Sequence, residues 1–420
     1  MKILVYGINF APELTGIGKY TGEMVAWLTS HGHEVRVVTA PPYYPAWKVG
    51  DGYSATKWTQ GQWQGASVWR CPVWVPAKPG GLKRLIHLAS FALSSLPVML
   101  RQIIWRADVV WVVEPALFCA PTACLVARLG GAKAWLHVQD FEVDAAFELG
   151  LLRGRRIRKL VEGCERWLLR RFDVVSTISN RMMDKLLAKG VAPERAVLAP
   201  NWVDISAISP RPEAAGHSPY RAELGIPVDA VVALYSGNMG AKQGLEILAE
   251  IARLDELSAA DEVQRLPIVF VFCGGGAGRA GLQAMCAGLK HVYFLPLQPL
   301  ARLNDLLAMA DIHLLPQRAD AADLVMPSKL TGMLASGRPV VATALTTTEL
   351  AQVVLGTGPD AQCGLVVPPE NAALLLAAVQ KLAYDPPARK RMGAAGRAYA
   401  EHKLQIDMVL GQLAAQMQSE

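Results

Sequence analysis

The sequence lacks the cysteine patterns of disulfide frameworks and of structural zinc sites. Its seven cysteines are odd in number, and no two of them form a Cys-x-x-Cys pair. Chains of this kind are typical of a reducing compartment, so we expect free thiols in the cytosol. A signal peptide is also lacking, because the first apolar run is short and ends at Asn9, Pro12 and Glu13. That run is typical of the first strand of a sheet.

Nor does the sequence contain a long uninterrupted hydrophobic segment. The most apolar segment, 81–106, is interrupted by His87 and Pro97. Its longest apolar stretch of about 16 residues falls short of the roughly 20 that a membrane-spanning helix needs. Basic residues at both of its ends favour an amphipathic helix that lies in the membrane interface.

A second segment, 153–171, holds eight basic and two acidic residues. Its apolar residues are predicted to share one helix face: Ile157, Leu160, Val161, Cys164 and Leu168. Each basic residue near an anionic leaflet contributes about 1 kcal/mol, which favours a membrane surface; a core helix with a solvated basic face is the alternative. Nucleic acid is not expected as a partner, because no recognised binding module accompanies the charges. The residues predicted to face the membrane are Lys83, Arg84, Arg153, Arg155, Arg156, Arg158 and Lys159.

The sequence does contain enough apolar residues for two large cores. Of its 420 residues, 52% are hydrophobic and 19% charged, which suits two domains of roughly 200 residues each. Residues 1–200 hold 25 basic and 15 acidic residues, whereas the remainder holds 17 and 21. This asymmetry indicates two domains with different partners, and the proline-rich stretch 200–228 is predicted to connect them.

Short apolar runs alternate with helix-length segments in both halves, which is typical of parallel sheets with crossover helices. The predicted strands are 3–8, 35–39, 109–113, 134–138 and 174–178 in the first half, and 230–236, 268–273, 292–295, 312–315 and 339–342 in the second. We therefore predict an α/β fold of two doubly wound, Rossmann-like domains that face each other across a cleft.

A glycine-rich loop follows the first predicted strand. Thr15, Gly16 and Gly18 precede a helix predicted from about residue 19 to residue 30. The glycines let the backbone approach a ligand, and the helix start supplies N–H donors. A nicotinamide enzyme would need a third glycine where the sequence has Thr21, and an acidic residue after the second strand, where it has none. We therefore do not expect a nicotinamide cofactor.

Asp140 ends the predicted strand 134–138, at the edge where α/β sheets bind ligands. It is suited either to a hydrogen bond with an acceptor hydroxyl or to capping the next helix, and we favour the acceptor contact. His137 lies inside the strand, and we expect it to point into the core.

The stretch 327–342, PSKLTGMLASGRPVVA, is typical of a nucleotide-sugar site. A helix that opens beside Ser328 and Lys329 offers backbone N–H groups, a positive dipole end and an ammonium, which together bind a diphosphate. Gly337 is expected in a left-handed conformation after this helix, and Pro339 prevents its continuation. An ordinary helix-to-strand unit is the alternative.

Two further glycine-rich turns follow predicted strands of the second half. One holds Gly237, Asn238 and Lys242, and the other holds Gly274 and Gly275. A charge-assisted contact from Lys242 to a phosphate would contribute about 1.5–3 kcal/mol. Each turn alone is weak evidence, but three such turns at successive strand ends predict a phosphate site.

Together these motifs resemble the retaining glycosyltransferases of family four, whose GT-B fold has two Rossmann-like domains around a cleft. The resemblance covers nearly the whole chain, from Pro12-Glu13 to Gly337-Arg338-Pro339-Val340-Val341. The opening and the segment 323–344 are most similar to the fucosyltransferases of colanic acid synthesis. The donor-site residues that the motifs and the resemblance together indicate are Thr15, Gly16, Gly18, Gly237, Asn238, Lys242, Gly274, Gly275, Leu324, Pro327, Ser328 and Lys329.

The sequence departs from the family pattern at its glutamate pair. The family carries two glutamates eight positions apart, and Leu324 and Gly332 stand there, with Asp323 beside the first. The arginine of the first phosphate loop is replaced by Asn238, which leaves Lys242 and Lys329 as the cations.

The resemblance implies transfer of a sugar, fucose from GDP-fucose or another sugar from a GDP or UDP donor. The acceptor would be a polyprenyl-diphosphate-linked oligosaccharide at the cytoplasmic face of the inner membrane. Residues 1–200 would bind the acceptor and the membrane, 205–400 the nucleotide-sugar, and a C-terminal helix in 401–420 would pack back on the first domain.

In this mechanism Lys242 and Lys329 stabilise the leaving diphosphate and Asp140 orients the acceptor. No metal ion and no other cofactor is expected, since the sequence has no Asp-x-Asp motif. Two alternatives are a sugar-nucleotide epimerase and a non-catalytic scaffold that binds nucleotide-sugar or lipid.

Overall fold

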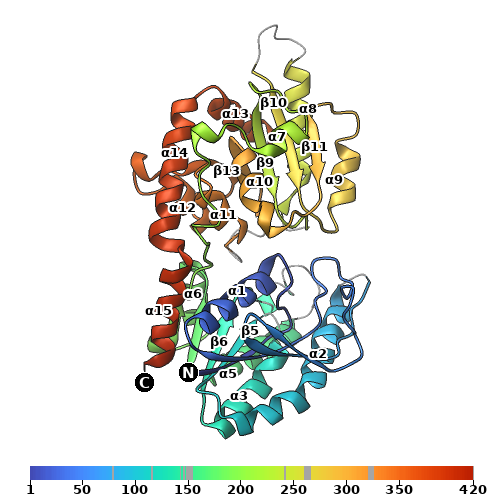
Figure 1. Cartoon of the computed structure of the whole chain (residues 1–420), viewed down its shortest axis with the longest axis vertical. Helices are drawn as coiled ribbons and strands as arrows, with labels where there is room; N and C mark the ends of the chain where they lie inside the picture. Colours follow the sequence, from blue (N-terminus) through green and yellow to red (C-terminus); the bar gives the residue numbers. More distant parts are fainter. Residues whose placement is uncertain are drawn as a thin grey trace. The chain divides into compact units, whose positions relative to one another are not determined.

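The computed structural model describes residues 1–77, 80–114, 117–141, 143–144, 147, 155–240, 243–259, 266–319 and 326–419. The chain divides into two compact units: Met1–Pro200 with Leu410–Glu420, and Asn201–Val409. We call them the first and the second unit. Each consists of a central sheet with helices packed against it (Figure 1).

The first unit is built on an eight-stranded sheet of order β3-β4-β2-β1-β5-β6-β7-β8. Neighbouring strands are parallel except β3 and β4. The strands are β1 (Lys2–Tyr6), β2 (Glu34–Thr39), β3 (Thr59–Trp63), β4 (Ala66–Arg70), β5 (Val109–Glu114), β6 (Lys133–Val138), β7 (Val174–Thr177) and β8 (Ala196–Leu198). Every residue of β5 is buried, as expected for a parallel strand with both faces covered.

Helices cover this sheet and connect its strands. They are α1 (Gly16–Ser30), α2 (Gly81–Gln102), α3 (Ala120–Gly130), α5 (Arg155–Leu169) and α6 (Asn180–Ala188). The helices α2 and α3 pack side by side, and α3 lies against β5 and β6. A hydrogen bond of 2.6 Å between the hydroxyls of Tyr6 and Ser95 holds α2 against β1.

The chain returns to the first unit at its C-terminal end. Helix α15 (Ile406–Gln418) enters this unit at Leu410. Lys133 at the start of β6 donates a hydrogen bond to the carbonyl oxygen of Ser419.

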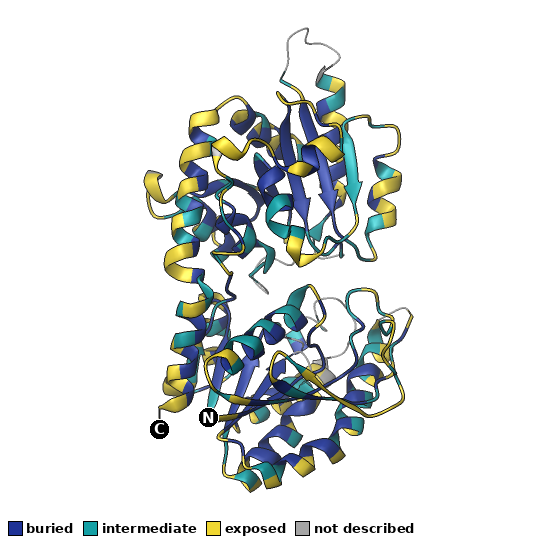
Figure 2. Cartoon of the chain, viewed as in Figure 1, coloured by how far each residue is buried: buried dark blue, intermediate teal, exposed yellow. Residues whose placement is uncertain are grey.

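The second unit holds a parallel six-stranded sheet of order β11-β10-β9-β12-β13-β14. The strands are β9 (Val231–Ser236), β10 (Ile268–Cys273), β11 (Val292–Leu295), β12 (Ile312–Leu315), β13 (Val340–Thr343) and β14 (Gly364–Val367). Its helices are α7 (Pro219–Glu223), α8 (Glu246–Ala259), α9 (Arg279–Met285), α10 (Leu303–Met309), α11 (Lys329–Ala335), α12 (Glu349–Leu355), α13 (Ala372–Ala383) and α14 (Pro386–Tyr399). The central strands are fully buried, as Figure 2 shows by their dark colour.

The strand order reverses beside the first strand of each sheet. In the first unit β1 lies between β2 and β5, and in the second β9 lies between β10 and β12. Ligands of open α/β sheets bind outside the carboxyl ends of the strands at such reversal points. The loops after β1 and β9 are therefore the parts of the two sheets best placed for a ligand.

The structure confirms the predicted α/β fold and each predicted strand. Four strands are not predicted by the periodicity: β3, β4, β8 and β14. Strand β3 has mostly exposed polar residues, and β8 and β14 have only three and four residues, so neither gives a clear apolar pattern. Helix α1 begins at Gly16 instead of near residue 19, because Thr15 is its extended N-cap.

The buried side of α5 is offset from the apolar face that the sequence predicts. Leu160 is 68% exposed and Cys164 is exposed, whereas Glu165 and Leu169 are buried. The physical reason is a buried ion pair: Lys189 of the segment after α6 bonds Glu165 at 2.5 Å, so a charged residue lies on the inner face. Sequence periodicity counts such a residue as exposed.

Candidate functional site

The loops after β9 and β10 interlock through their glycines. The amide of Gly237 donates to the carbonyl oxygen of Cys273 at 3.0 Å, and the amide of Met239 donates to that of Gly275 at 2.8 Å. Gly274 has a φ of +145°, and a Cβ there would lie 1.9 Å from the carbonyl oxygen of Gly237. Only glycine fits this position, because two backbones touch where a side chain would be.

Gly275 is open toward the surroundings, since a Cβ there would meet no atom of the described residues within 4 Å. At this point the interlocked loops present bare backbone. Such bare backbone suits the close approach of a phosphate.

Lys329 lies against the first of these loops. Its Nζ donates to the hydroxyl of Tyr235 at 2.9 Å, and that hydroxyl donates to the carbonyl oxygen of Asn238 at 2.6 Å. A Cβ on Gly237, which has a φ of +139°, would lie 3.4–3.6 Å from the end of the Lys329 side chain. The ammonium, Tyr235 and the glycine loop therefore form one cluster at the carboxyl end of β9.

Burial lowers the pKa of Lys329 to about 7. Its Nζ also lies 4.3 Å from the ring centroid of Tyr235, a cation–π contact. Among the residues that the structure describes, no carboxylate pairs with Lys329. A bound diphosphate would supply the missing negative charge and favour the ammonium form.

Helix α11 is short and ends as expected. Gly337 follows it with a φ of +69°, and its amide donates to the carbonyl oxygen of Leu334 at 3.1 Å. Pro327 and Ser328 precede the helix, so its first amides begin beside Lys329.

Two predicted donor residues, Lys242 and Leu324, lie outside the described residues, as does Asp323. Of the cations in this unit that the structure describes, Arg279 is used internally: its guanidinium donates to the carbonyl oxygens of Gly274 and, at 2.8 Å, Leu295. It holds the glycine turn in shape.

In the first unit, Thr15 and Gly16 stand at the start of α1. Thr15 is the N-cap residue, yet its side chain makes no capping hydrogen bond, and its Oγ1 is buried without a hydrogen-bond partner among the described residues. Gly16 has a φ of +61°. A hydroxyl in this place can hydrogen-bond a ligand at the helix start, where the amides of the first turn also point.

Gly18 is needed for packing against a buried carboxylate. A Cβ on Gly18 would lie 2.4 Å from Oε2 of Glu13. Oε1 of Glu13 accepts hydrogen bonds from the amides of Tyr43 and Tyr44 at 3.1 and 3.0 Å, and Oε2 accepts one from Asn9 at 3.0 Å. Glu13 thus joins the loop after β1, the loop after β2 and the first turn of α1.

Burial raises the pKa of Glu13 to about 7, although the hydrogen bonds from the Tyr44 and Tyr43 amides and from Asn9 lower it. Tyr44 lies in the same cluster. Burial raises the pKa of the Tyr44 hydroxyl, and the negative charges of Glu13 and Asp140 raise it further. The positive charge of Arg84 lowers it.

Asp140 therefore lies near Tyr44, at the carboxyl edge of the first sheet. Asp140 follows β6 and is partly buried. His137 lies in the core as expected. Its Nδ1 shares a hydrogen bond of 2.9 Å with the hydroxyl of Ser176, and its ring stacks on Trp111. Burial lowers its pKa to about 3.

The basic residues predicted to face a membrane lie in two helices. Lys83 and Arg84 are in the first turn of α2, and Arg155 begins α5. Arg153 lies outside the described residues. Arg156, Arg158 and Lys159 are exposed on α5, where Arg158 pairs with Glu162 at 2.7 Å.

Sequence reasoning did not identify Tyr235 and Glu13 as parts of the two sites. Tyr235 belongs to an apolar strand, and Glu13 belongs to a loop, so neither stands out by residue pattern. The sequence signal for Glu13 is its place between Pro12 and Gly16. A carboxylate in such a loop is equally typical of a solvent-exposed side chain.

Two family models match the chain. The model described as "Glycosyl transferase 4-like domain" matches residues 15–202, and "Glycosyl transferases group 1" matches residues 218–399. A curated relative, the putative colanic acid biosynthesis glycosyl transferase WcaI of Escherichia coli K12, is 46% identical over 98% of both chains.

Solved structures agree on the fold. Sucrose-phosphate synthase from Thermosynechococcus elongatus matches with a TM-score of 0.74 at 16% identity, over 99% of this chain and 98% of that one. Anabaena HepE in complex with UDP and glucose matches with a TM-score of 0.71 at 14% identity, over the full length of both chains. The fold that these neighbours share is GT-B.

Proposed function

Because the chain belongs to the group 1 glycosyltransferases and is a GT-B enzyme, we propose that it moves a sugar, fucose from GDP-fucose, to a lipid-linked oligosaccharide in colanic acid-type exopolysaccharide synthesis. The binding of a nucleotide-sugar donor by the second unit is supported by the cluster of Lys329, Tyr235 and the interlocked glycine loops. The exopolysaccharide is suggested by the name of the relative that is 46% identical. The fucose donor and the lipid-linked acceptor are proposed from the resemblance of the motifs.

The donor diphosphate would lie on the glycine loops after β9 and β10. Lys329 would contact it, and the open backbone at Gly275 leaves room for its oxygens. Lys242, which stands between β9 and α8 in the sequence, would supply a second cation. These groups stabilise the charge that develops on the leaving diphosphate, which is the main catalytic demand of the reaction.

The proposed step breaks the bond between the anomeric carbon and the diphosphate oxygen. The acceptor hydroxyl attacks the same face, its oxygen bonds the anomeric carbon, and its proton passes to the departing phosphate. Asp140 is the residue proposed to orient that hydroxyl. Protein cations and amide dipoles neutralise the leaving group in this scheme, which needs no metal ion or further cofactor.

The first unit is proposed to bind the acceptor and to lie at the cytoplasmic face of the inner membrane. Its charge supports this assignment: residues 1–200 hold ten more basic than acidic residues. An acceptor that carries a polyprenyl diphosphate stays in the membrane, so the enzyme must meet it there.

Release of nucleoside diphosphate from a panel of GDP- and UDP-sugars tests the proposal. We expect release from GDP-fucose only when a membrane lipid-oligosaccharide fraction is added. Release from another donor would support the transferase activity and contradict fucose as the donor sugar. Tight nucleotide binding without release from any donor would favour the scaffold, which the Leu324 and Gly332 replacements motivate.

A further inference from the structure

The outward face of α2 is apolar along its whole length. The helix buries His87, Phe91, Ser95 and other residues on one side. The opposite side, with the 3₁₀ turn Ile103–Trp105 that follows the helix, exposes five large aliphatic residues at helical spacing: Leu82, Ile86, Leu93, Leu100 and Ile104, with exposed fractions of 70%, 46%, 73%, 39% and 87%. We call these five residues the α2 stripe. A helix that packs on a sheet normally has a polar outer face, so this one is unusual.

Charge is confined to the ends of the α2 stripe. Lys83 and Arg84 lie at its start and Arg101 and Arg106 at its end, with no lysine, arginine, aspartate or glutamate between Arg84 and Arg101. By length and composition the segment Gly81–Trp105 could cross a membrane, contrary to the sequence-based expectation. Its inner side belongs to the core of the first unit, so it is not available as a free spanning helix.

Helix α3, which packs beside α2, continues the pattern. Leu125 and Leu129 on α3 are 45% and 62% exposed. Between them Arg128 lines a surface hollow of about 630 Å³ that α3 shares with α5. Apolar and cationic side chains thus alternate on this helix.

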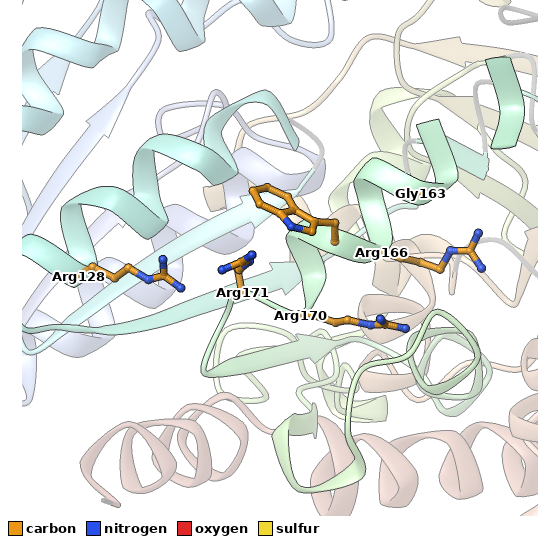
Figure 3. Close-up of a pocket in the computed structure, with 6 residues that line it drawn as sticks. Arg128, Gly163, Arg166, Arg170 and Arg171 are labelled. Carbon is orange, nitrogen blue, oxygen red and sulfur yellow. The ribbon is translucent and has the colours of Figure 1, made fainter. Parts of the chain in front are cut away.

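The hollow is lined by arginines and one exposed tryptophan: Arg128, Arg166, Trp167, Arg170 and Arg171, with Gly163. Figure 3 shows Arg128 and Arg171 pointing toward each other, whereas Arg166 and Arg170 extend away from them. The guanidinium of Arg171 lies 4.6 Å from the ring centroid of Trp167. The cations are therefore spread over a surface instead of converging on one point.

Within the described residues, none of these four guanidinium groups forms an ion pair; the one hydrogen bond that they make runs from Arg166 to the carbonyl oxygen of Glu162. Cations at helix C-termini stabilise the helix dipole, but one per helix is enough for that. The dipole also gives no reason for an exposed indole among the arginines.

Helix α5 is fixed in this orientation. Glu165 on its inner side bonds Lys189, which also bonds Asp144 at 3.1 Å, and Leu169 is buried. Turning the arginines inward would break this buried ion pair, which is costly because one charge would remain unpaired.

We propose that the outer face of α2, α3 and α5 binds the surface of an anionic phospholipid bilayer. The α2 stripe, Leu125 and Leu129 enter the boundary between headgroups and acyl chains, and the arginines around Trp167 contact lipid phosphates. The inference deepens the membrane location in the proposed function and rests on it. It keeps the segment 81–106 at the membrane, as the sequence predicts, adds α3, and moves the contact on α5 from its basic start to the arginines at its end.

The shape of the surface favours a bilayer over a soluble anion. The α2 stripe runs from Leu82 to Ile104, or about 33 Å of helix, which no single phosphate covers. A nucleic acid would use the arginines but would leave the aliphatic residues in water. A bilayer satisfies both kinds of side chain at once.

Vesicle co-sedimentation of the full chain tests the inference. The vesicles contain phosphatidylethanolamine with phosphatidylglycerol, or phosphatidylcholine alone, at low and at high salt. The apolar variant is L93Q/L100Q, and its matched control is L257Q/L374Q, which changes two exposed leucines of the second unit. The charge variant is R166Q/R170Q, and its control is K381Q/R391Q, which removes two exposed charges from the second unit.

We expect L93Q/L100Q to lower the vesicle partition coefficient about tenfold at both salt concentrations. R166Q/R170Q should lower it about tenfold on anionic vesicles at low salt and much less at high salt, since exposed charges are screened. Both controls should bind like the unmodified chain. Nucleotide affinity, measured in parallel, should be the same for all variants and reports an intact second unit, while an unchanged circular dichroism spectrum reports that the whole chain keeps its secondary structure.

Equal vesicle binding by the unmodified chain and both variants would overturn the inference and leave the membrane location to another surface. If the unmodified chain bound to no vesicle, both the proposed surface and the proposed membrane location would be overturned. The transferase activity would still be tested separately by nucleoside diphosphate release. A dimer that L93Q/L100Q dissociates in sedimentation without lipid would show that the α2 stripe is a protein interface, and would also overturn the inference.

Discussion

The loops after β1 and β9 occupy equivalent places in the two sheets, at the points where the strand order reverses. Both are rich in glycine, but their glycines are required by different neighbours. In the second unit Gly274 meets the backbone of Gly237, whereas in the first unit Gly18 meets the side chain of Glu13. A backbone cannot move aside without moving its strand, and a side chain can.

The two loops also differ in the charge that each one buries. The loop after β9 packs against Lys329, the first residue of α11, whose pKa is lowered to about 7, and the loop after β1 holds Glu13, whose pKa is raised to about 7. A cation without a carboxylate partner among the described residues prepares a site for an anion. A buried carboxyl held by three hydrogen bonds fixes loops in place, and the comparison predicts separate effects for mutations in each.

Gly274→Ala should have the largest effect on stability. A Cβ 1.9 Å from the carbonyl oxygen of Gly237 forces the two loops apart, and the φ of +145° adds strain. We expect a loss of about 3 kcal/mol in the free energy of unfolding. Chemical denaturation measures it. Gly275→Ala is the matched control, because its Cβ meets no atom within 4 Å; equal losses in both variants would contradict the interlocked loops.

Glu13→Gln should change how stability depends on pH. The folded-state pKa of about 7 lies above the unfolded value, so the folded chain holds this proton more tightly. The resulting stability is complete below about pH 4 and is lost as pH rises through about 7, by on the order of 3 kcal/mol.

The glutamine variant cannot titrate, so the difference in unfolding free energy between the two chains should shift across this window. Denaturation at pH 5 and pH 8 measures that shift. A constant difference at both pH values would show that Glu13 is ionised in the folded chain throughout.

Lys329→Ala should lower turnover at least tenfold, which corresponds to about 1.4 kcal/mol of transition-state stabilisation. The variant removes the ammonium that faces the glycine loop but no backbone contact, so its melting temperature should stay close to that of the unmodified chain. Initial rates of nucleoside diphosphate release measure the effect. Lys290→Ala, at an exposed position of the same unit, is the control. Similar turnover in the two variants would show that Lys329 does not take part in the reaction.

Proton uptake on nucleotide binding is the smallest effect and the most specific. At pH 8 a Lys329 side chain with a pKa of about 7 is mostly neutral, and a bound diphosphate favours its ammonium form. Binding should then take up as much as one proton at pH 8 and much less at pH 6. Titration calorimetry in buffers of different ionisation enthalpy measures this number, and Lys329→Met should abolish it. Equal uptake by the methionine variant would assign the proton to another group.

Much of the fold was predictable, because short buried strands and glycine turns leave local patterns. The strands 268–273 and 312–315 are predicted with their exact ends, and Lys329 follows from the helix start beside it. The face of α5 was not predictable, since the buried side holds the charged Glu165. Its partner Lys189 is 24 residues away, beyond the reach of helical periodicity.

The parts of the two sites that were missed depend on contacts between distant segments. Glu13 bonds amides 30 and 31 residues away, and Lys329 bonds a tyrosine 94 residues away. A sequence pattern detects a glycine but not the neighbour that requires it.

By itself, the sequence determined the alternation of strands and helices, the positions of the glycine-rich turns and the uneven charge of the two halves. These follow from local properties, namely side-chain polarity, backbone freedom and helix-start chemistry. The tertiary structure decided which charged groups are buried and what each glycine touches. Burial and packing arise only when distant segments meet, and they set the pKa values of Glu13 and Lys329 and the apolar outer face of α2.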